Sequence, residues 1–342
     1  MSLLQVDNLT LRFGGLTAVN KVSFTMKPGQ IMAVIGPNGA GKTSLFNAIS
    51  GVYSPDTGTI LLNGKTASRP FTRRTIAGLV AAALFTMVFF VTLVNLEALW
   101  EAAIAANYVY QEAFPWGAAI KSTVTYLRET ESRYVLGAGI LGAIMGAASF
   151  YTVWWRGRFA PHVAAAAGLA RTFQNPRLFY EMSVLENVLV GMDRRLSTRF
   201  WHAAFRLPLH HRDNKEAVAR AMEILRFVKL DHLASDEAAS LCYGHQRKLE
   251  IARALASEPC LLLLDEPGAG MNPSEIVEIM QLIRDIRDKG VSVLLIEHHM
   301  RLVMGISDYV VVLEFGNKIA EGVPEEIRAN PKVRAAYLGN PD

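Results

Sequence analysis

The sequence has little cysteine, little charge and no repeats, and each of these shortages narrows the class of protein. Two cysteines in 342 residues cannot build a disulfide framework, which suits a reducing compartment such as the cytoplasm. Only 19% of the residues are charged and the net charge is +4, so the composition does not require a nucleic-acid partner. Internal repeats and low-complexity linkers are also lacking, which argues against repeat architectures.

Charge is absent altogether from two long stretches, residues 76–96 and 134–155. An α-helix rises about 1.5 Å per residue, so each stretch can cross a hydrocarbon core roughly 30 Å thick. Both stretches lie well inside the chain, which excludes a signal peptide. We therefore predict two transmembrane helices, rather than two buried helices of a soluble domain.

The charges around these stretches predict how the helices are oriented. Arginines flank the pair on its outer sides, whereas the connecting segment, residues 97–133, holds five acidic and three basic residues. Basic residues favour the cytoplasmic side, so we expect the connecting segment outside. The flanking arginines are Arg69, Arg73, Arg74, Arg156 and Arg158, and Trp100, Trp154 and Trp155 stand at helix ends like interfacial anchors. The aromatic residues of the connecting segment suit either the outer membrane surface or contact with another protein.

Small residues in the second stretch predict a close helix contact. Gly142 and Gly146 form a G-x-x-x-G pattern, which lets another helix approach closely. The partner is either the first stretch or a helix of another subunit, unless the pattern is a chance feature of a glycine-rich helix.

A phosphate-binding loop of the form G-x-x-x-x-G-K-[ST] stands at residues 36–43. The apolar run 31–35 before it predicts a buried strand, and residues 44–49 after it have helical spacing. Backbone N–H groups of such a loop surround a phosphate, and the helix N-terminus faces the anion. We expect Lys42 to reach the β- and γ-phosphates and the Thr43 hydroxyl to bind Mg²⁺.

A second apolar run, residues 261–264, ends in two carboxylates. Asp265 is placed to bind Mg²⁺ directly or through water, and Glu266 to polarise the attacking water, because phosphoryl transfer depends mainly on positioning. Two acids after a strand would by themselves indicate only a solvated strand end. Together with the phosphate loop, they predict a nucleoside triphosphatase.

Residues 241–255 lie between these two elements and resemble the signature motif of ATP-binding-cassette (ABC) ATPases. The order of the other motifs is similar to that family as well. Phe13 stands at the position of the adenine-stacking aromatic, Gln174 at the Q-loop, residues 270–273 at the D-loop, and His298 at the switch histidine.

Outside the predicted insertion, residues 1–65 and 168–342 look like the LivG-type ATP-binding subunits of branched-chain amino-acid importers. Four segments within them have sequences similar to those of that branch: residues 170–192, 265–273, 296–308 and 330–339. The resemblance, together with the residue-level reading, implies three sets of roles. The expected catalytic residues are Lys42, Gln174, Glu266 and His298. The expected ATP-binding residues are Phe13, Gly36, Pro37, Asn38, Gly39, Ala40, Gly41, Lys42, Thr43, Ser44, Cys242, Gly244 and His245. The expected Mg²⁺ ligands are Thr43, Gln174 and Asp265.

Three residues depart from the family pattern. Cys242 replaces the signature serine, whose hydroxyl in the family contacts the γ-phosphate of ATP bound to the partner subunit. A thiol is a weaker donor, so closure on ATP is expected to be weakened or carried by Gly244 and backbone groups. His245 replaces the usual glutamine, and His299 replaces an acidic residue. None of the three is a residue of the predicted catalytic set.

The expected fold is α/β: a P-loop ABC ATPase with a RecA-like core, an antiparallel β lobe and a helical lobe, interrupted by a two-helix transmembrane hairpin. Residues 1–69 and 161–342 are assigned to the ATPase and residues 70–160 to the insertion. Apolar and polar residues alternate in 1–30 and 55–66, which is typical of the strands of an antiparallel β lobe. Residues 175–250 are expected to be rich in helix. Gly316-Asn317 predicts a hairpin turn.

The resemblance implies an ATPase subunit that energises an importer of branched-chain amino acids with ATP and Mg²⁺. Its expected partners are two permease subunits, a second ABC ATPase that completes an ATP sandwich, and a periplasmic substrate-binding protein reached through the complex. The expected location is the bacterial inner membrane, with the ATPase on the cytoplasmic side. The alternatives are an importer of urea, amides or other amino acids, a non-transport ABC ATPase acting on ribosomes or DNA, and a membrane-anchored regulatory subunit. The basic and aromatic residues of 194–206 suit a membrane-proximal surface better than nucleic acid.

Overall fold

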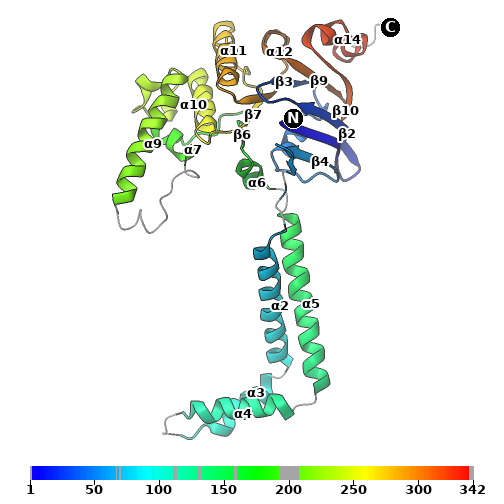
Figure 1. Cartoon of the computed structure of the whole chain (residues 1–342), viewed down its shortest axis with the longest axis vertical. Coiled ribbons are helices and arrows are strands. Elements are labelled where there is room, and N and C mark those ends of the chain that lie inside the picture. The colour runs from blue at the N-terminus through cyan, green and yellow to red at the C-terminus, as the bar shows by residue number, and fades with distance from the viewer. Residues whose placement is uncertain are drawn as a thin grey trace. The chain divides into compact units, whose positions relative to one another are not determined.

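The computed structural model describes residues 2–66, 68, 71–94, 96–110, 114–129, 132–157, 160–192 and 208–338. The chain forms two compact units, one made of Met1–Ser68 with Phe159–Asp342 and the other of Arg69–Arg158 (Figure 1). The larger unit is therefore assembled from two stretches of chain that lie on either side of the smaller unit in the sequence.

The larger unit is built on a six-stranded sheet in the order β10-β9-β3-β8-β7-β6. Every residue of β3 (Ile31–Ile35), β7 (Leu261–Asp265) and β8 (Ser292–Ile296) is buried. These strands pair in parallel and have apolar cores on both faces, which is why their sequences are continuous apolar runs. The sheet is completed by β6 (Leu169–Arg171), β9 (Tyr309–Glu314) and β10 (Asn317–Gly322), with β10 antiparallel to β9.

A four-stranded antiparallel sheet in the order β2-β1-β4-β5 forms the expected β lobe. Its strands are β1 (Leu4–Phe13), β2 (Leu16–Met26), β4 (Thr57–Leu62) and β5 (Lys65–Thr66). Inward side chains such as Leu4 and Phe24 share one apolar core with Met32 of the larger sheet and Phe46. That shared core fixes the β lobe to the strand that leads into the phosphate loop.

The hairpin between β9 and β10 turns one residue earlier than the sequence predicts. Phe315 and Gly316 form the turn with φ values of 43° and 79°, whereas Asn317 is already the first residue of β10. A two-residue hairpin turn often needs positive φ at both positions, and asparagine adopts positive φ more readily than phenylalanine does. The preference of asparagine for positive φ therefore led to the prediction of Gly316-Asn317 as the turn, and that prediction was wrong by one residue.

Helices flank the larger sheet and form a separate helical lobe (Figure 1). The lobe contains α7 (Val184–Met192), α9 (Pro208–Phe227) and α10 (Tyr243–Leu255), and α7 packs against both of the others. The remaining helices are α1 (Lys42–Ile49), α6 (Pro161–Ala166), α11 (Pro273–Asp288), α12 (Met300–Ile306), α13 (Pro324–Ala329) and α14 (Pro331–Leu338). At the D-loop, Asn272 and Glu275 form a capping box that starts α11.

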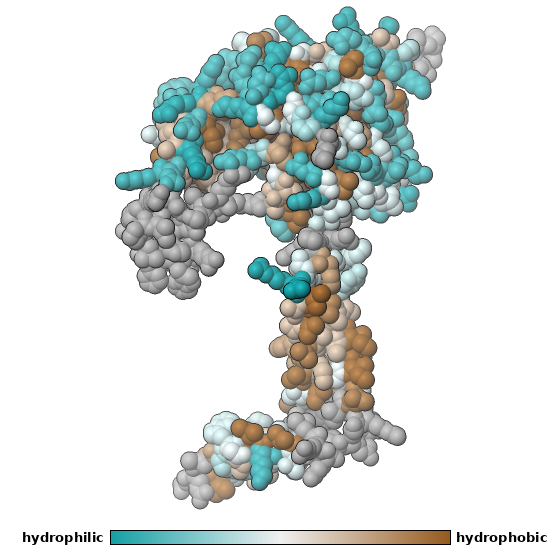
Figure 2. Space-filling model, in the orientation of Figure 1, coloured by the Kyte–Doolittle hydropathy of each residue, from teal (hydrophilic) through white to brown (hydrophobic). Residues whose placement is uncertain are grey.

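The smaller unit is a helical hairpin. Its long helices, α2 (Arg73–Val94) and α5 (Ser132–Arg156), pack along each other, and α3 (Leu96–Ala103) and α4 (Trp116–Glu129) lie in the connection (Figure 1). By length and composition, α2 and α5 are able to cross a membrane. None of the apolar stretch of α2 and 22% of that of α5 is buried, whereas the core helix of a soluble protein is mostly buried. Figure 2 shows apolar surface along both helices.

The two glycines of the G-x-x-x-G pattern pack against α2. A side chain at Gly142 would collide with Met87 and the Thr86 carbonyl, and one at Gly146 would collide with Ala82 and Thr86. The Thr86 hydroxyl also donates to the Gly142 carbonyl at 2.7 Å. The close helix contact is therefore made within the chain, by the first of the two stretches.

Some sequence predictions fall outside the described residues. Arg69, Arg158 and the basic and aromatic residues 194–206 are among them. Of the other flanking arginines, Arg73 and Arg74 begin α2, and Arg156 ends α5.

Candidate functional site

The phosphate loop connects β3 to α1, as strand and helix patterns on either side of it predict. Its residues and the first turn of the helix are Gly36, Pro37, Asn38, Gly39, Ala40, Gly41, Lys42, Thr43 and Ser44. Gly41 has a φ of 93°, and a Cβ atom there would overlap the carbonyl oxygen of Ala18 in β2. Glycine is required at this position both for its conformation and for the close approach of the β lobe.

Lys42 is buried at the start of α1 and turns back onto its own loop. Its Nζ donates to the carbonyl oxygens of Gly36 at 2.6 Å and Pro37 at 2.9 Å. Burial lowers the pKa of Lys42, and the nearby carboxylates Glu266 and Asp265 partly oppose that shift. The ammonium therefore lies in the loop where a phosphate would replace its carbonyl partners.

Three residues predicted from separate motifs meet around one carboxylate. Glu266 follows β7 with a φ of 47°, and its N–H donates to Ile296 at the end of β8 at 3.0 Å. The Gln174 Nε2 donates to Glu266 Oε2 at 2.8 Å, and the Nδ1 of His298 lies 3.7 Å from the same oxygen. A water bound here would face a carboxylate, an amide and an imidazole, the groups that can orient it and accept its proton.

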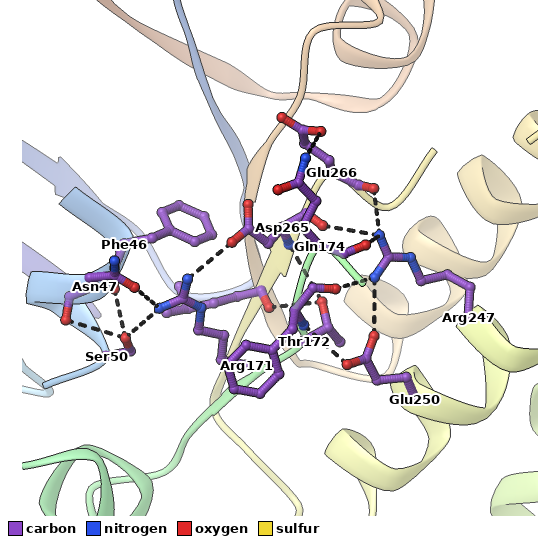
Figure 3. Close-up of polar contacts among 12 residues, drawn as sticks. Phe46, Asn47, Ser50, Arg171, Thr172, Gln174, Arg247, Glu250, Asp265 and Glu266 are labelled. Carbon is purple, nitrogen blue, oxygen red and sulfur yellow. Dashed lines mark hydrogen bonds and ion pairs between the residues drawn. The ribbon is translucent and has the colours of Figure 1, made fainter. Parts of the chain in front are cut away.

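Arg171 is a functional candidate that the sequence reasoning missed. Its guanidinium donates to Asn47 Oδ1 at 2.7 Å, to Ser50 Oγ at 2.8 Å and to Asp265 Oδ2 at 3.0 Å (Figure 3). The side chains of Arg171 and Asp265 are only 9% and 7% exposed. The pair joins the end of β7 to the helix that carries Lys42 and Thr43.

Arg247 was also missed, although it lies in the signature segment. Its side chain is fully buried and donates to the main-chain carbonyls of Phe173, Gln174, Asp265 and Glu266 (Figure 3). It also pairs with Glu250 one turn along α10 at 3.0 Å.

Glu250 extends this connection to the Q-loop. Its Oε1 accepts the N–H groups of Phe173 at 3.1 Å and Arg177 at 3.3 Å. The buried Arg247–Glu250 pair therefore fastens the signature helix to the Q-loop and to the end of β7. An arginine and a glutamate three residues apart on an otherwise apolar helix face were the available signal.

A third missed residue, Glu297, supports the switch histidine. It is fully buried and accepts the N–H groups of Gly268 at 2.7 Å, His298 at 2.9 Å and His299 at 3.2 Å. The carboxylate therefore fixes the backbone at the end of β8, where His298 projects. The sequence signal for it was an acidic residue directly after an apolar strand.

The signature residues lie at the start of α10, in the helical lobe. Cys242 is the exposed N-cap residue and makes no side-chain cap bond, and a Cβ at Gly244 would lie 2.9 Å from Glu275 of α11. Burial, followed by the charges of Lys248 and His232, lowers the pKa of His245 below its ordinary value of 6.5. His245 is consequently neutral at pH 7, like the glutamine it replaces in the family pattern.

Phe13 ends β1 with 43% of its surface exposed and has an aromatic neighbour that the sequence did not indicate. Its ring meets that of Tyr53 edge to face, with centroids 5.1 Å apart and planes at 75°. Tyr53 therefore packs edge to face against the Phe13 ring, which is the ring expected to stack on a planar base.

A cleft of about 740 Å³ brings the predicted metal-binding residues together. Thr43, Gln174 and Asp265 all line it, as do Arg171 and Arg177. A hydroxyl, an amide oxygen and a carboxylate are hard oxygen donors, which fit Mg²⁺. Within the described part of the chain, no three His, Cys, Asp or Glu side chains gather as a metal site.

Comparison with known proteins gives a consistent family. The sequence model described as ABC transporter matches residues 19–108 and 153–269, and that of the branched-chain amino acid ATP-binding cassette transporter matches residues 317–342. The chain is 36% identical over 338 residues to the high-affinity branched-chain amino acid transport ATP-binding protein BraF of Pseudomonas aeruginosa, covering 98% of both chains. It is 35% identical over 338 residues to LivG of Escherichia coli K12, again covering 98% of both.

Solved structures agree on the fold. A nucleotide-free ATP-binding cassette of an ABC transporter superposes with a TM-score of 0.64 at 24% identity, covering 99% of this chain and 100% of that one. The ADP conformation of an ATP-binding cassette gives the same TM-score at 25% identity and the same coverage.

Proposed function

This chain belongs to the ATP-binding subunits of ABC transporters, in the branch that includes LivG and BraF, and from that membership we propose that it hydrolyses ATP to drive import of branched-chain amino acids. Like other subunits of this family, it binds ATP, works with permease partners and lies on the cytoplasmic side of the inner membrane. We further propose that the complete transporter contains two permeases, a second ABC ATPase and a substrate-binding protein. One observation carries the ATPase role: Gln174 and His298 converge on Glu266 beside an intact phosphate loop.

In the proposed reaction, the phosphate loop and Lys42 bind the β- and γ-phosphates, and Phe13, packed against Tyr53, stacks on the base. Glu266 orients the attacking water and accepts its proton, while His298 and Gln174 hold the carboxylate and the water in line. Thr43, Gln174 and Asp265 would hold Mg²⁺, which supplies positive charge to the phosphate oxygens. Cys242, Gly244 and His245 act on the ATP of the partner subunit, as membership of the ABC family implies.

The proposed coupling surface for a permease is formed by Gln174 and the neighbouring helical lobe. It exposes the Q-loop next to Arg177, whose guanidinium lies 4.3 Å from the Phe173 ring centroid. Movement of a permease segment seated there would reach Glu266 through Gln174 and through the Arg247–Glu250 pair. The coupling surface and the hydrolytic carboxylate are therefore joined by direct contacts.

The inserted unit is proposed to be a transmembrane hairpin, with α3 and α4 on the outer side. Exposed apolar residues such as Phe85 and Val88 on α2 and Ile144 and Val153 on α5 would contact lipid, since the small-residue faces are already used between the two helices. Trp155, 52% exposed at the end of α5, suits the interface. The ATPase halves then remain in the cytoplasm with the arginine-bearing ends of both helices.

The proposed assembly is tested by isolating the tagged chain in mild detergent and identifying its partners by mass spectrometry. Recovery of permease subunits and a second ATPase would support the importer, and the identity of the permeases would separate branched-chain amino acids from urea, amides or other amino acids. Recovery of ribosomal or DNA-bound proteins, or of a folded membrane-embedded chain without partners, would contradict it.

Replacing His245 with glutamine is expected to remove an acid-sensitive component of ATP hydrolysis. Because the pKa of His245 is lowered below its ordinary value of 6.5, the imidazole becomes protonated and loses its acceptor nitrogen only as the pH falls below that value. The parent rate should therefore fall relative to the variant as the pH is lowered below 6.5, by about threefold, the effect of one ordinary hydrogen bond. Phosphate release by the assembled complex measures this ratio, and a ratio that stays constant as the pH is lowered would contradict a role for His245 at the nucleotide.

A further inference from the structure

Two buried arginines reach the end of β7, and they bind different parts of it. Arg247 donates hydrogen bonds to the main-chain carbonyls of Asp265 and Glu266. Arg171 instead donates a hydrogen bond to a side-chain oxygen, Asp265 Oδ2, at 3.0 Å (Figure 3). A substitution at Arg171 therefore acts on the carboxylate itself, whereas one at Arg247 acts on the backbone beneath it.

The Arg171 guanidinium is held in place on three sides. Nη1 is bound by Asn47 Oδ1 and Ser50 Oγ, Nη2 is bound by Asp265, and the Cζ atom lies 5.6 Å from the centroid of Phe173. A planar guanidinium with this many fixed partners cannot rotate without breaking bonds that burial makes costly. The direction in which it holds Asp265 is therefore set by α1.

The anchor on α1 is significant because the same helix begins with Lys42 and Thr43. Asn47 lies in the second turn of that helix, and Ser50 is its C-cap residue. Arg171 thus fixes Asp265 relative to Thr43, the two groups proposed to face a metal from opposite motifs. It occupies one oxygen of Asp265, Oδ2, and leaves Oδ1 for another ligand.

We propose that Arg171 is a positioning residue for Asp265, and that it sets how tightly the nucleotide site holds a divalent cation together with ATP. The inference rests on the proposed ATPase function and goes beyond it. An outer residue that orients a ligating carboxylate commonly changes metal affinity by a factor of ten or more when it is replaced. Arg171 is expected to act in the same way through the oxygen it holds.

Lysine at position 171 separates geometry from charge. It retains the positive charge beside Asp265 but has a single ammonium group, which cannot reach Asp265, Asn47 and Ser50 together as the guanidinium fork does. If only the charge mattered, Arg171→Lys would leave cation binding unchanged. If positioning matters, the cation should be held less tightly although the local charge is the same.

The experiment measures binding rather than turnover, on the full chain in its complex with Glu266→Gln present to slow hydrolysis. Mn²⁺ is titrated at saturating ATP and followed by electron paramagnetic resonance, and ATP affinity is measured separately in EDTA. We expect Arg171→Lys to weaken Mn²⁺ binding about tenfold and to leave ATP affinity in EDTA unchanged. Asn47→Ala, which removes one anchor and keeps the Arg171–Asp265 pair, should give a smaller change in the same direction.

Arg253→Lys is the control, because Arg253 is likewise a partly buried arginine but lies in α10 over the Phe179 ring. Its effect on ATP and Mn²⁺ binding should be equal, so that the ratio of the two affinities stays at the parent value. The positioning role would be overturned if the ratio of the two affinities stayed at the parent value in both Arg171→Lys and Asn47→Ala. Tighter Mn²⁺ binding by either variant would also overturn it. Failure of the parent complex to bind ATP at all would instead overturn the proposed function, so the two failures are distinguishable.

Discussion

Replacing Glu266 with glutamine is expected to leave ATP binding intact and to slow hydrolysis by a factor of about 100 to 10,000. The substitution preserves the size of the side chain and the backbone, whose N–H donates to Ile296 at 3.0 Å. It removes the carboxylate that Gln174 and His298 approach at 2.8 and 3.7 Å. A neutral amide cannot accept the proton of the attacking water, so the chemical step should be lost while the phosphate loop still binds nucleotide.

Phosphate release by the assembled complex at saturating Mg²⁺ and ATP measures the first quantity, and equilibrium binding of labelled ATP measures the second. Glu186→Gln is a suitable control, since a glutamine preserves the capping box that Glu186 forms with Ser183 at the start of α7. That control should hydrolyse ATP at the parent rate. Turnover by Glu266→Gln close to that of the control would rule out Glu266 as the general base.

Deleting the inserted unit is expected to reduce recovery of the chain with its permeases by a factor on the order of 100, while ATP binding by the remaining ATPase is retained. A membrane anchor makes the meeting of two membrane-bound partners effectively intramolecular, and its loss removes that gain. The deletion should cover residues 69–158 and keep Ala160, because a Cβ at Gly51 would lie 2.9 Å from Ala160, which shows how closely the two backbones pack.

The fraction of chain that copurifies with a tagged permease measures the effect. A hairpin of two plain leucine-rich helices of the same length, inserted at the same place, serves as the control. Recovery restored by this control would mean that the hairpin acts as an anchor alone, whereas recovery that stays low would indicate specific packing against the permease periphery. Assembly and transport unchanged by the deletion itself would contradict both roles.

Much of the site was predictable because its motifs are local. The phosphate loop is encoded within eight consecutive residues, and the strand before it and the helix after it have their own apolar spacing. Asp265 and Glu266 follow a continuous apolar run that predicts a buried strand, and residues 76–96 and 134–155 lack charge over the length of a bilayer. In each of these cases the physical cause, whether sterics, burial or desolvation, acts between near neighbours in the chain.

The contacts that hold these motifs together were not predictable. Arg171 and Asp265 are 94 residues apart in the sequence, and Arg247 and Phe173 are 74 apart. Arg171 does not differ in type or spacing from the exposed arginines of the chain, and the spacing of Arg247 and Glu250 does not reveal which distant carbonyl groups Arg247 contacts. Only the tertiary structure buries the two arginines, and burial is what makes an unpaired guanidinium costly and its partners specific.

By itself, the sequence determined the nucleotide-binding loop, the acidic strand end, the family and the existence of two long apolar helices. The tertiary structure decided which helix faces the glycines of α5, that Phe315 rather than Asn317 enters the hairpin turn, and that Arg171, Arg247 and Glu297 support the site. The reason is common to all of these. Local patterns specify which element forms, whereas the pairing of buried polar groups depends on which distant segments the shared core brings within hydrogen-bonding distance.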